Sequence, residues 1–411
     1  MQQLKRKHMT SCRNWVVRMN KFWKKGVAIV AALSMMSTVG CAGTSSNQTT
    51  KITDSSTLKV DRDLFYGACY CAYEAEVWHG RDVSKEIEAM EEIGAKTFRL
   101  WMCSNYIMED PQTFKENDVK IMKNIIAEAQ GRGIEVIGMN NAWFSGSSDY
   151  MAVPMRNMKE GSNYEKFLLN YEETWYQLAK KFPEINIWEI GNEWNNDTFL
   201  HPYEYESSGL IFTFSEKVDI TTDMLYYASK GIHRANPEAL TVLGGLVDVY
   251  EEGFGNAKNF LEKIYINIES GEWPSDNPDQ YFQIAAWHPY NHSGAPNEAW
   301  VKHQKDIYQV IKDHEGHDKV VLFTELGLSD YGNAETDKGQ KDDVITTLTL
   351  VKEELPFVQS VHWFRMFNES SAASWGGAFE TGFGLFTEPD ENGNFELKTK
   401  GEAYLEMSGG K

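Results

Sequence analysis

Residues 185–195 read INIWEIGNEWN, and residues 320–327 read VVLFTELG. Both stretches begin with a short run of apolar and β-branched residues, which is typical of a strand buried on both faces. Each run leads into a glutamate, Glu193 in the first stretch and Glu325 in the second. In sheets built from parallel strands, functional residues gather at the carboxyl ends of the strands. Both glutamates are therefore candidates for a site at one end of such a sheet.

Six further runs of the same kind alternate with helix-patterned segments along the chain. Eight strands that alternate with helices predict the α/β class and a parallel sheet, and a closed (β/α)8 TIM barrel is the arrangement that eight such units favour. An open doubly wound sheet is the alternative, but no glycine-rich phosphate loop follows the first predicted strand. The predicted strands are 64–68, 97–100, 135–139, 185–190, 241–243, 282–286, 320–323 and 358–363. The predicted helices are 84–93 with Ser84 as N-cap, 119–130, 164–181, 222–234, 258–269, 299–312, 341–354 and 401–407.

The first forty residues differ in composition from the rest of the chain. They hold eight Lys and Arg, no Asp or Glu, and an apolar run at 26–39 that has the length of a signal-peptide core. The run ends in Ser-Thr-Val-Gly-Cys, which resembles the lipobox of bacterial lipoproteins. We therefore predict a lipoprotein signal peptide at 1–40 and lipidation of Cys41; the alternative is an ordinary secretory signal. The polar composition of 41–56 predicts a flexible linker, followed by one catalytic domain at 57–411 in an extracytoplasmic, membrane-anchored protein.

The chain is strongly acidic. It has 40 Lys and Arg against 60 Asp and Glu, a formal charge of −20, and loss of the eight basic residues of the signal peptide would make this −28. Such a surface repels nucleic acid and anionic membranes, and it disfavours a polyanionic substrate. A neutral oligo- or polysaccharide is compatible with it. We therefore expect no nucleic-acid partner, membrane contact only through the lipid anchor, and a monomer.

The sequence holds no pattern that is typical of a metal or cofactor site. Cys69, Cys71 and Cys103 lack a fourth ligand at zinc-site spacing. No His-x-His motif follows the first predicted strand, as a metal-dependent barrel hydrolase would require, and no Ser-His-Asp nucleophile elbow is present. We expect buried thiols, no metal and no cofactor.

Glu193 and Glu325 follow the fourth and the seventh predicted strands, which lie on opposite sides of an eight-membered ring. Two carboxyl groups that face each other across a barrel mouth suit glycoside hydrolysis, and a retaining mechanism needs them about 5–5.5 Å apart. Either glutamate alone could equally be a buried charge paired with a barrel arginine. The occurrence of both at predicted strand ends favours an active site.

The pair Asn192-Glu193 after the fourth strand, together with Glu325 on the seventh, resembles clan A of the glycoside hydrolases. This clan includes the family 5 cellulases and mannanases and the family 39 xylosidases, and the resemblance extends over the chain after residue 60. It implies that Glu193 is the acid/base, that Glu325 is the nucleophile and that Asn192 hydrogen-bonds the sugar 2-hydroxyl. The Gly-Gly pair at 244–245 is more similar to family 39, and Trp194 stands where family 5 members often carry proline.

Further residues match sugar-binding positions of the clan. Arg99, in the sequence FRLW, matches the strand-two arginine near the nucleophile, and it is also a candidate partner for Glu189. His288 and Tyr290, in the sequence WHPY, match the pattern after strand six. The resemblance implies that the tyrosine contacts the nucleophile and that the histidine binds sugar hydroxyls. Trp363 matches the strand-eight tryptophan beneath the sugar in the −1 subsite.

Trp143 lies in a polar loop after the third predicted strand, where an aromatic ring is suited to stack on the apolar face of a sugar. Packing in the core is the alternative for this ring. The sequence as a whole predicts a retaining β-glycosidase. A catalytically silent, glycan-binding surface lipoprotein on the same barrel is the alternative, and the intact pair Glu193 and Glu325 disfavours it.

Overall fold

The computed structural model describes residues 52–250, 253–291, 294–330, 337–374 and 377–411. The predicted signal peptide, Cys41 and most of the predicted linker lie outside these residues. The last residues of the predicted linker are packed against the domain, because Ser55 is buried and its backbone N–H donates to the Asp279 carboxylate over 3.0 Å. The packed part of the chain therefore begins before the predicted domain start at 57.

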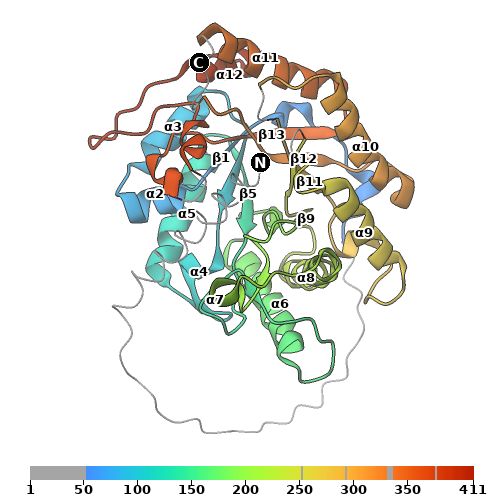
Figure 1. Ribbon diagram of the computed structural model, residues 1–411. Coiled ribbons are helices and arrows are strands. Elements are labelled where there is room, and N and C mark those ends of the chain that lie inside the picture. The colour runs from blue at the N-terminus through green and yellow to red at the C-terminus, as the bar shows by residue number, and fades with distance from the viewer. Residues whose placement is uncertain (1–51, 251–252, 292–293, 331–336, 375–376) are drawn as a thin grey trace.

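Within the described residues, nine strands form one parallel sheet in the order β10-β11-β12-β13-β1-β2-β5-β7-β9 (Figure 1). A parallel β-bridge between Val242 in β9 and Ile284, directly before β11, joins β9 to the β11 side of the sheet and closes the ring. The predicted (β/α)8 barrel is confirmed, because β9 and β10 together supply its fifth strand. The strands are β1 (Tyr66–Tyr70), β2 (Thr97–Trp101), β5 (Glu135–Asn140), β7 (Ile187–Ile190), β9 (Leu240–Leu243), β10 (Leu246–Val249), β11 (Ala285–Tyr290), β12 (Val321–Leu326) and β13 (Val358–Phe364).

Gly244 and Gly245 separate β9 from β10 because no side chain fits at either position. A Cβ at Gly244 would lie 2.4 Å from the carbonyl oxygen of Ile190, and a Cβ at Gly245 would lie 2.1 Å from Nε2 of His288. The carbonyl oxygen of Gly245 also accepts a hydrogen bond from the Glu193 N–H over 2.8 Å. The two glycines thus allow the fourth, fifth and sixth barrel strands to approach closely at the mouth.

The strands differ from the predicted bounds by one to four residues, so that β7 begins at 187 and β12 extends to 326, past Glu325. Two differences have a local cause or a consequence for the site. β1 begins two residues later than predicted, because Arg62–Leu64 forms a 3-10 turn in which the Asp61 carboxylate accepts the Asp63 N–H. β11 extends to residue 290 and not only to 286. His288 and Tyr290 therefore lie within the sixth strand, at its carboxyl end.

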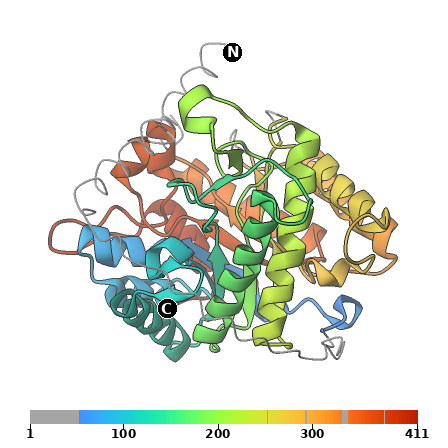
Figure 2. The same ribbon diagram turned by 90° about the horizontal axis from the view of Figure 1, so that it is seen from below.

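The predicted helices are all present, and they surround the sheet (Figures 1 and 2). The N-cap of α3 (Val83–Glu92) is Asp82, whose carboxylate accepts the Lys85 N–H, and not Ser84 as predicted. The other large difference is α8, which begins at Phe214 because Thr213 and Glu216 form a capping box there. None of the described helices is both long and apolar enough to cross a membrane. The remaining helices are α2 (Ala72–His79), α4 (Ser104–Ile107), α5 (Glu116–Gly131), α6 (Asn163–Lys181), α7 (Tyr205–Ser208), α8 (Phe214–Ala235), α9 (Ala257–Glu269), α10 (Glu298–Glu315), α11 (Asp337–Glu354) and α12 (Thr399–Ser408).

Candidate active site

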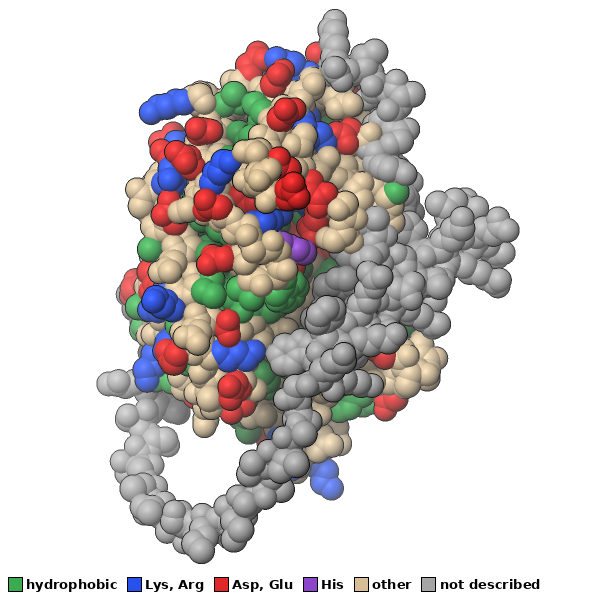
Figure 3. Space-filling view, turned by 90° about the vertical axis from the view of Figure 1, so that its left-hand side faces the viewer, with side chains coloured by type: hydrophobic (Ala, Val, Ile, Leu, Met, Phe, Trp, Pro, Cys, Tyr) green, Lys and Arg blue, Asp and Glu red, His purple; other side chains and the backbone are tan. Residues whose placement is uncertain are grey.

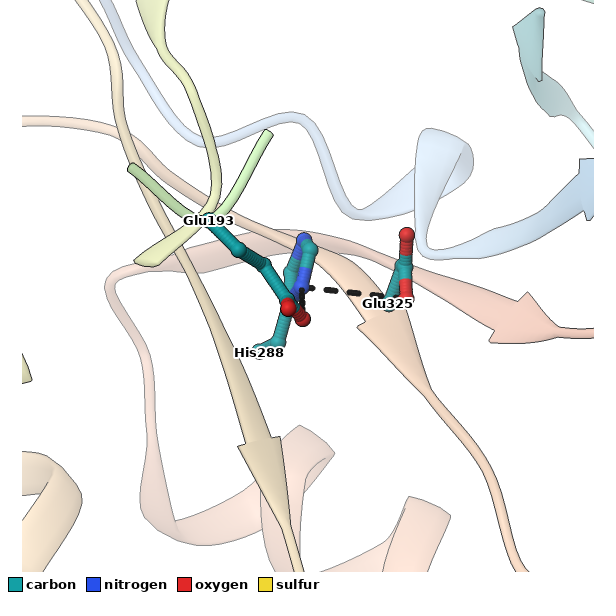
Figure 4. Close-up of side chains that lie close together, drawn as sticks. All are labelled: Glu193, His288 and Glu325. Carbon is teal, nitrogen blue, oxygen red and sulfur yellow. Dashed lines mark hydrogen bonds and ion pairs between the residues drawn. The ribbon is translucent and has the colours of Figure 1, made fainter. Parts of the chain in front are cut away.

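Glu193 and Glu325 approach each other at the barrel mouth, with the ring of His288 between them (Figure 4). One carboxylate oxygen of each glutamate and a ring nitrogen of His288 all lie within 4.8 Å of one another. This spacing is close to the separation of about 5–5.5 Å in retaining glycosidases. Inverting glycosidases keep their carboxyl groups about 6.5–9.5 Å apart to admit a water molecule. The geometry therefore fits a double displacement.

The turn after β7 holds Glu193 in a constrained backbone conformation. Glu193 has a φ of 49°, in the left-handed region, and Gly191 before it has a φ of 91°. Oδ1 of Asn141 accepts the backbone N–H of Asn192 over 3.0 Å and the indole N–H of Trp194 over 2.7 Å. A non-glycine residue in this region costs about 1–3 kcal/mol and persists only where its surroundings hold it. Here the hydrogen bonds to Asn141, after the third barrel strand, and to Gly245, in the fifth, hold Glu193 in this conformation.

Arg99 is completely buried in the barrel and connects the two halves of the site. Its Nη1 donates to Oε1 of Glu325 over 2.6 Å, and its Nη2 donates to Oδ1 of Asn192 over 2.8 Å. The same guanidinium binds both carboxylate oxygens of Glu189, so the predicted pair between these residues is present. Arg99 therefore lies beside the predicted nucleophile and orients the Asn192 amide.

The surroundings of Glu325 keep its carboxyl group ionised. Burial raises the pKa of Glu325, but the charges of His288 and Arg99 and a hydrogen bond from Tyr290 outweigh it and lower the pKa below its ordinary value. The Tyr290 hydroxyl donates to Oε2 over 2.9 Å. Burial and the charge of Glu325 raise the pKa of Tyr290, so the phenol stays protonated and remains a donor. An ionised, well-oriented carboxylate is what a nucleophile requires.

His288 contacts the predicted acid/base. Its Nδ1 lies 2.8 Å from Oε1 of Glu193 and its Nε2 lies 3.0 Å from the Thr324 hydroxyl. The ring is completely buried, and its Nδ1 is also 3.7 Å from Oε2 of Glu325. The ring therefore orients Glu193, which differs from the contact with sugar hydroxyls that the resemblance implied.

Glu193, His288 and Glu325 form the one group of potential ligands that is close enough to hold a metal ion among the described residues. Both oxygens of Glu325 are already bound, one by Arg99 and the other by Tyr290. The guanidinium 2.6 Å away would repel a cation. The surroundings of this group therefore disfavour a metal ion.

Trp143 does not face the site. The side chain is 1% exposed, and its indole N–H donates to the carbonyl oxygen of Ala152 over 2.9 Å. Its ring is packed against Phe167, Tyr171 and Trp194 at centroid distances of 6.0 to 6.4 Å. A ring enclosed in this way has no free face for a sugar, so the stacking role expected from the sequence does not fit, and the core-packing alternative does.

Trp363 points away from the barrel mouth. It is completely buried, and its ring packs edge-on against Tyr404 of α12. Side chains alternate between the two faces of a strand. The neighbouring Phe364 therefore points to the other face, where its ring lies 6.4 Å from Tyr290 and 5.5 Å from Phe383. The aromatic residue at the mouth of the eighth strand is thus Phe364, one residue beyond the expected position.

Glu380 is a third carboxyl group near the pair that the sequence did not point to. It lies in a 3-10 turn, Ala378–Gly382, after β13. Burial raises its pKa to about 7; the charge of Arg365 opposes this shift, and the charges of Glu325 and Glu193 add to it. No periodic pattern marks an irregular loop, so local sequence carries no signal for such a residue.

The chain resembles known proteins along most of its length. The model of the family described as cellulase (glycosyl hydrolase family 5) matches residues 58–363. No curated protein matches the chain.

Similar solved structures are glycosidases with the same kind of barrel. A family 39 glycoside hydrolase from the gut symbiont Bacteroides cellulosilyticus WH2 aligns with a TM-score of 0.58 and 14% identity, over 87% of this chain and 64% of that one. The family 1 β-glucosidase from Thermotoga maritima aligns with a TM-score of 0.57 and 13% identity, over 86% of this chain and 99% of that one. The exo-β-1,4-mannosidase Op5Man5 from Opitutaceae bacterium strain TAV5 aligns with a TM-score of 0.58 and 15% identity, over 87% of this chain and 61% of that one. The chain spans less than two thirds of the first and third of these proteins, and at such identities the likeness concerns the fold.

Proposed function

The chain belongs to glycosyl hydrolase family 5, and from this premise we propose that it cleaves β-glycosidic bonds in a neutral oligo- or polysaccharide with retention of anomeric configuration. The observation that carries the proposal is the spacing of at most 4.8 Å between carboxylate oxygens of Glu193 and Glu325. At this distance one carboxylate reaches the anomeric carbon while the other reaches the glycosidic oxygen.

In the first step the Glu325 carboxylate attacks the anomeric carbon, and Glu193 donates its proton to the departing glycosidic oxygen. The products of this step are a glycosyl ester on Glu325, an ionised Glu193 and the released alcohol. Arg99 and Tyr290 hold the two oxygens of Glu325 in place. His288 holds Glu193 over 2.8 Å.

In the second step Glu193 acts as the base. A water molecule gives its proton to the Glu193 carboxylate and attacks the anomeric carbon, and Glu325 leaves as a carboxylate. Both residues return to their starting protonation states. Two inversions at one carbon restore the original anomeric configuration.

The charge of the chain supports a neutral substrate. The sequence has 60 Asp and Glu against 40 Lys and Arg. On the face shown in Figure 3, acidic side chains gather near the centre, with basic ones dispersed among them. The ionised carboxylate of Glu325 adds negative charge inside the mouth. A uronic acid polymer would be repelled by such a site.

The anomer formed first tests this function. We expect proton NMR of a digest of a soluble β-glycan to show the β-anomer of the new reducing end before mutarotation, because the displacement is double. A panel of β-glucan, mannan, xylan and aryl β-glycosides supplies the substrate. An α-anomer formed first would contradict the mechanism. A folded protein without turnover on any member of the panel would favour the silent glycan-binding alternative.

We also propose that the protein is held at the extracytoplasmic face of a bacterial membrane by a lipid on Cys41. This residue lies outside the described part of the chain, and the support is the lipobox-like sequence that precedes it. A lipoprotein anchor of two or three acyl chains binds firmly, whereas an acidic protein surface adds no attraction to an anionic membrane.

Cys41→Ser is therefore expected to move the protein from the membrane fraction to the soluble fraction of expressing cells. The matched control is Ser45→Ala in the same segment, which is expected to stay with the membrane. Immunoblots of both fractions measure the distribution. A wild-type protein found entirely in the medium would show that the signal is an ordinary secretory one.

A further inference from the structure

A cleft of about 420 Å³, whose lining includes neither Glu193 nor Glu325, lies between the amino-terminal end of α6 and the residues before α7. The residues that line it include Pro154, Met155, Asn157, Asn163, Tyr203 and Glu204. They come from the two long segments that follow the third and fourth barrel strands. These segments begin at the carboxyl ends of β5 and β7, so the cleft lies on the same end of the barrel as the active site.

The two segments that form the cleft are fastened to each other. β6 (Ala152–Val153) pairs with β8 (His201–Pro202), which joins the loop after the third barrel strand to the loop after the fourth. Nε2 of His201 lies 2.8 Å from the Asp149 carboxylate, which adds a second connection. The walls of the cleft are therefore formed before any ligand binds, which lowers the entropic cost of binding.

Tyr203 offers an aromatic surface inside this frame. The residue is 37% exposed, while its hydroxyl donates to the carbonyl oxygen of Ser145 in the opposite loop. Met155, across the cleft, is 50% exposed. An immobilised tyrosine ring beside an apolar wall matches the apolar C–H face of a sugar ring. The side-chain amides of Asn157 and Asn163 border the cleft and are suited to sugar hydroxyls.

The local charge disfavours an anionic ligand. The described residues that line the cleft include the carboxylate of Glu204 and no lysine or arginine. At the start of α6 the Ser162 hydroxyl accepts the Glu165 N–H over 3.0 Å, and the Glu165 carboxylate accepts the Gly161 N–H over 2.5 Å. The Glu165 carboxylate therefore adds a second negative charge near the cleft. A neutral sugar is therefore a better match than a phosphate or a carboxylate.

We propose that this cleft is a second carbohydrate-binding site, which holds a neutral segment of the polysaccharide substrate at a distance from the catalytic pair. The proposal rests on the proposed function, since it names the same polymer. The hydrogen bonds and ion pairs of Glu193, His288 and Glu325 among the described residues involve none of the lining side chains. A volume of about 420 Å³ is within the range of small-ligand sites, and it suits one or two sugar rings of a longer chain.

Tyr203→Ala tests the proposal in the full-length protein. Binding is measured by affinity electrophoresis in gels that contain the intact polysaccharide that the wild-type protein hydrolyses. We expect the Tyr203→Ala variant to bind about tenfold more weakly than wild type, because the stacking surface is lost. Turnover of a short aryl β-glycoside is expected to stay unchanged, since such a substrate reaches only the catalytic pair. Tyr203→Phe keeps the ring and is expected to keep most of the binding. Leu169→Ala, at an exposed apolar position on α6 outside the cleft, is the matched control.

The outcomes separate this proposal from the proposed function. Unchanged polysaccharide binding in Tyr203→Ala, with normal aryl glycoside turnover, would overturn the second site and leave the enzyme assignment intact. Reduced turnover of the aryl glycoside by the folded variant would place the cleft in the catalytic groove and would also overturn a separate site. If wild type hydrolyses no glycoside, the proposed function itself fails.

Discussion

Glu325→Gln is expected to abolish hydrolysis of every substrate, with kcat lower by roughly 10⁵-fold, which corresponds to about 7 kcal/mol of transition-state stabilisation. A neutral amide is a poor nucleophile, so the glycosyl ester cannot form. In the wild type Arg99 donates to one oxygen of Glu325 and Tyr290 donates to the other. In the variant the amide oxygen still accepts the bond from Arg99, and the amide NH2 group can donate to the Tyr290 hydroxyl oxygen once that hydroxyl turns. The fold is therefore expected to persist, and an unchanged melting temperature serves as the check.

Trapping the intermediate identifies the nucleophile directly. A 2-fluoro glycoside slows the second step, so the wild-type protein is expected to accumulate one sugar on the peptide that contains Glu325. Peptide mass spectrometry locates the label. A label on Glu193 or Glu380, or residual activity of Glu325→Gln above about 1%, would refute the assignment of Glu325 as nucleophile.

Glu193→Ala is expected to lose activity selectively. General acid–base catalysis contributes about 10²–10⁴-fold, so substrates whose leaving group needs a proton should lose activity by a factor near the upper end of this range. A dinitrophenyl glycoside needs no proton and should still glycosylate Glu325. The loss of the base then slows the second step, which stopped-flow kinetics would record as a burst followed by a slow steady state.

Azide restores the second step because it attacks without a base. We expect added azide to accelerate turnover of the dinitrophenyl substrate by Glu193→Ala and to yield the β-glycosyl azide. The matched control is Glu325→Ala, in which azide attacks the substrate directly and is expected to yield the α-azide. No acceleration of a folded Glu193→Ala protein, or an α-azide from it, would mean that Glu193 is not the acid/base.

The barrel and the positions of the two glutamates follow from local patterns in the chain. An apolar, β-branched run such as INIWEI identifies a buried strand without knowledge of its neighbours. The alternation of eight such runs with helices predicts the barrel, and the barrel places the carboxyl ends of all strands at one mouth. Glu193 and Glu325 could therefore be assigned to one site although they are 132 residues apart in the sequence.

Other features of the site depend on contacts that local patterns do not encode. The sequence suggested Trp143 and Trp363 as sugar-stacking residues. Trp143 is buried by the path of its loop. Trp363 points away from the mouth because side chains alternate along β13, and Phe364 points towards it instead. His288 reaches Glu193 because Gly245, between β9 and β10, leaves room for its ring.

Periodicity along the chain records which residues are apolar and how they are spaced, so it predicts strands, helices and the end of the barrel where the glutamates lie. It does not specify whether a given aromatic side chain points into the barrel mouth or towards the surrounding helices, or which loops pack together. Those contacts arise when segments far apart in sequence are brought together by burial of their apolar surface. For this reason only the tertiary structure identified the cleft beside Tyr203 and the carboxyl group of Glu380, whereas the proposed catalytic pair could be predicted from the sequence alone.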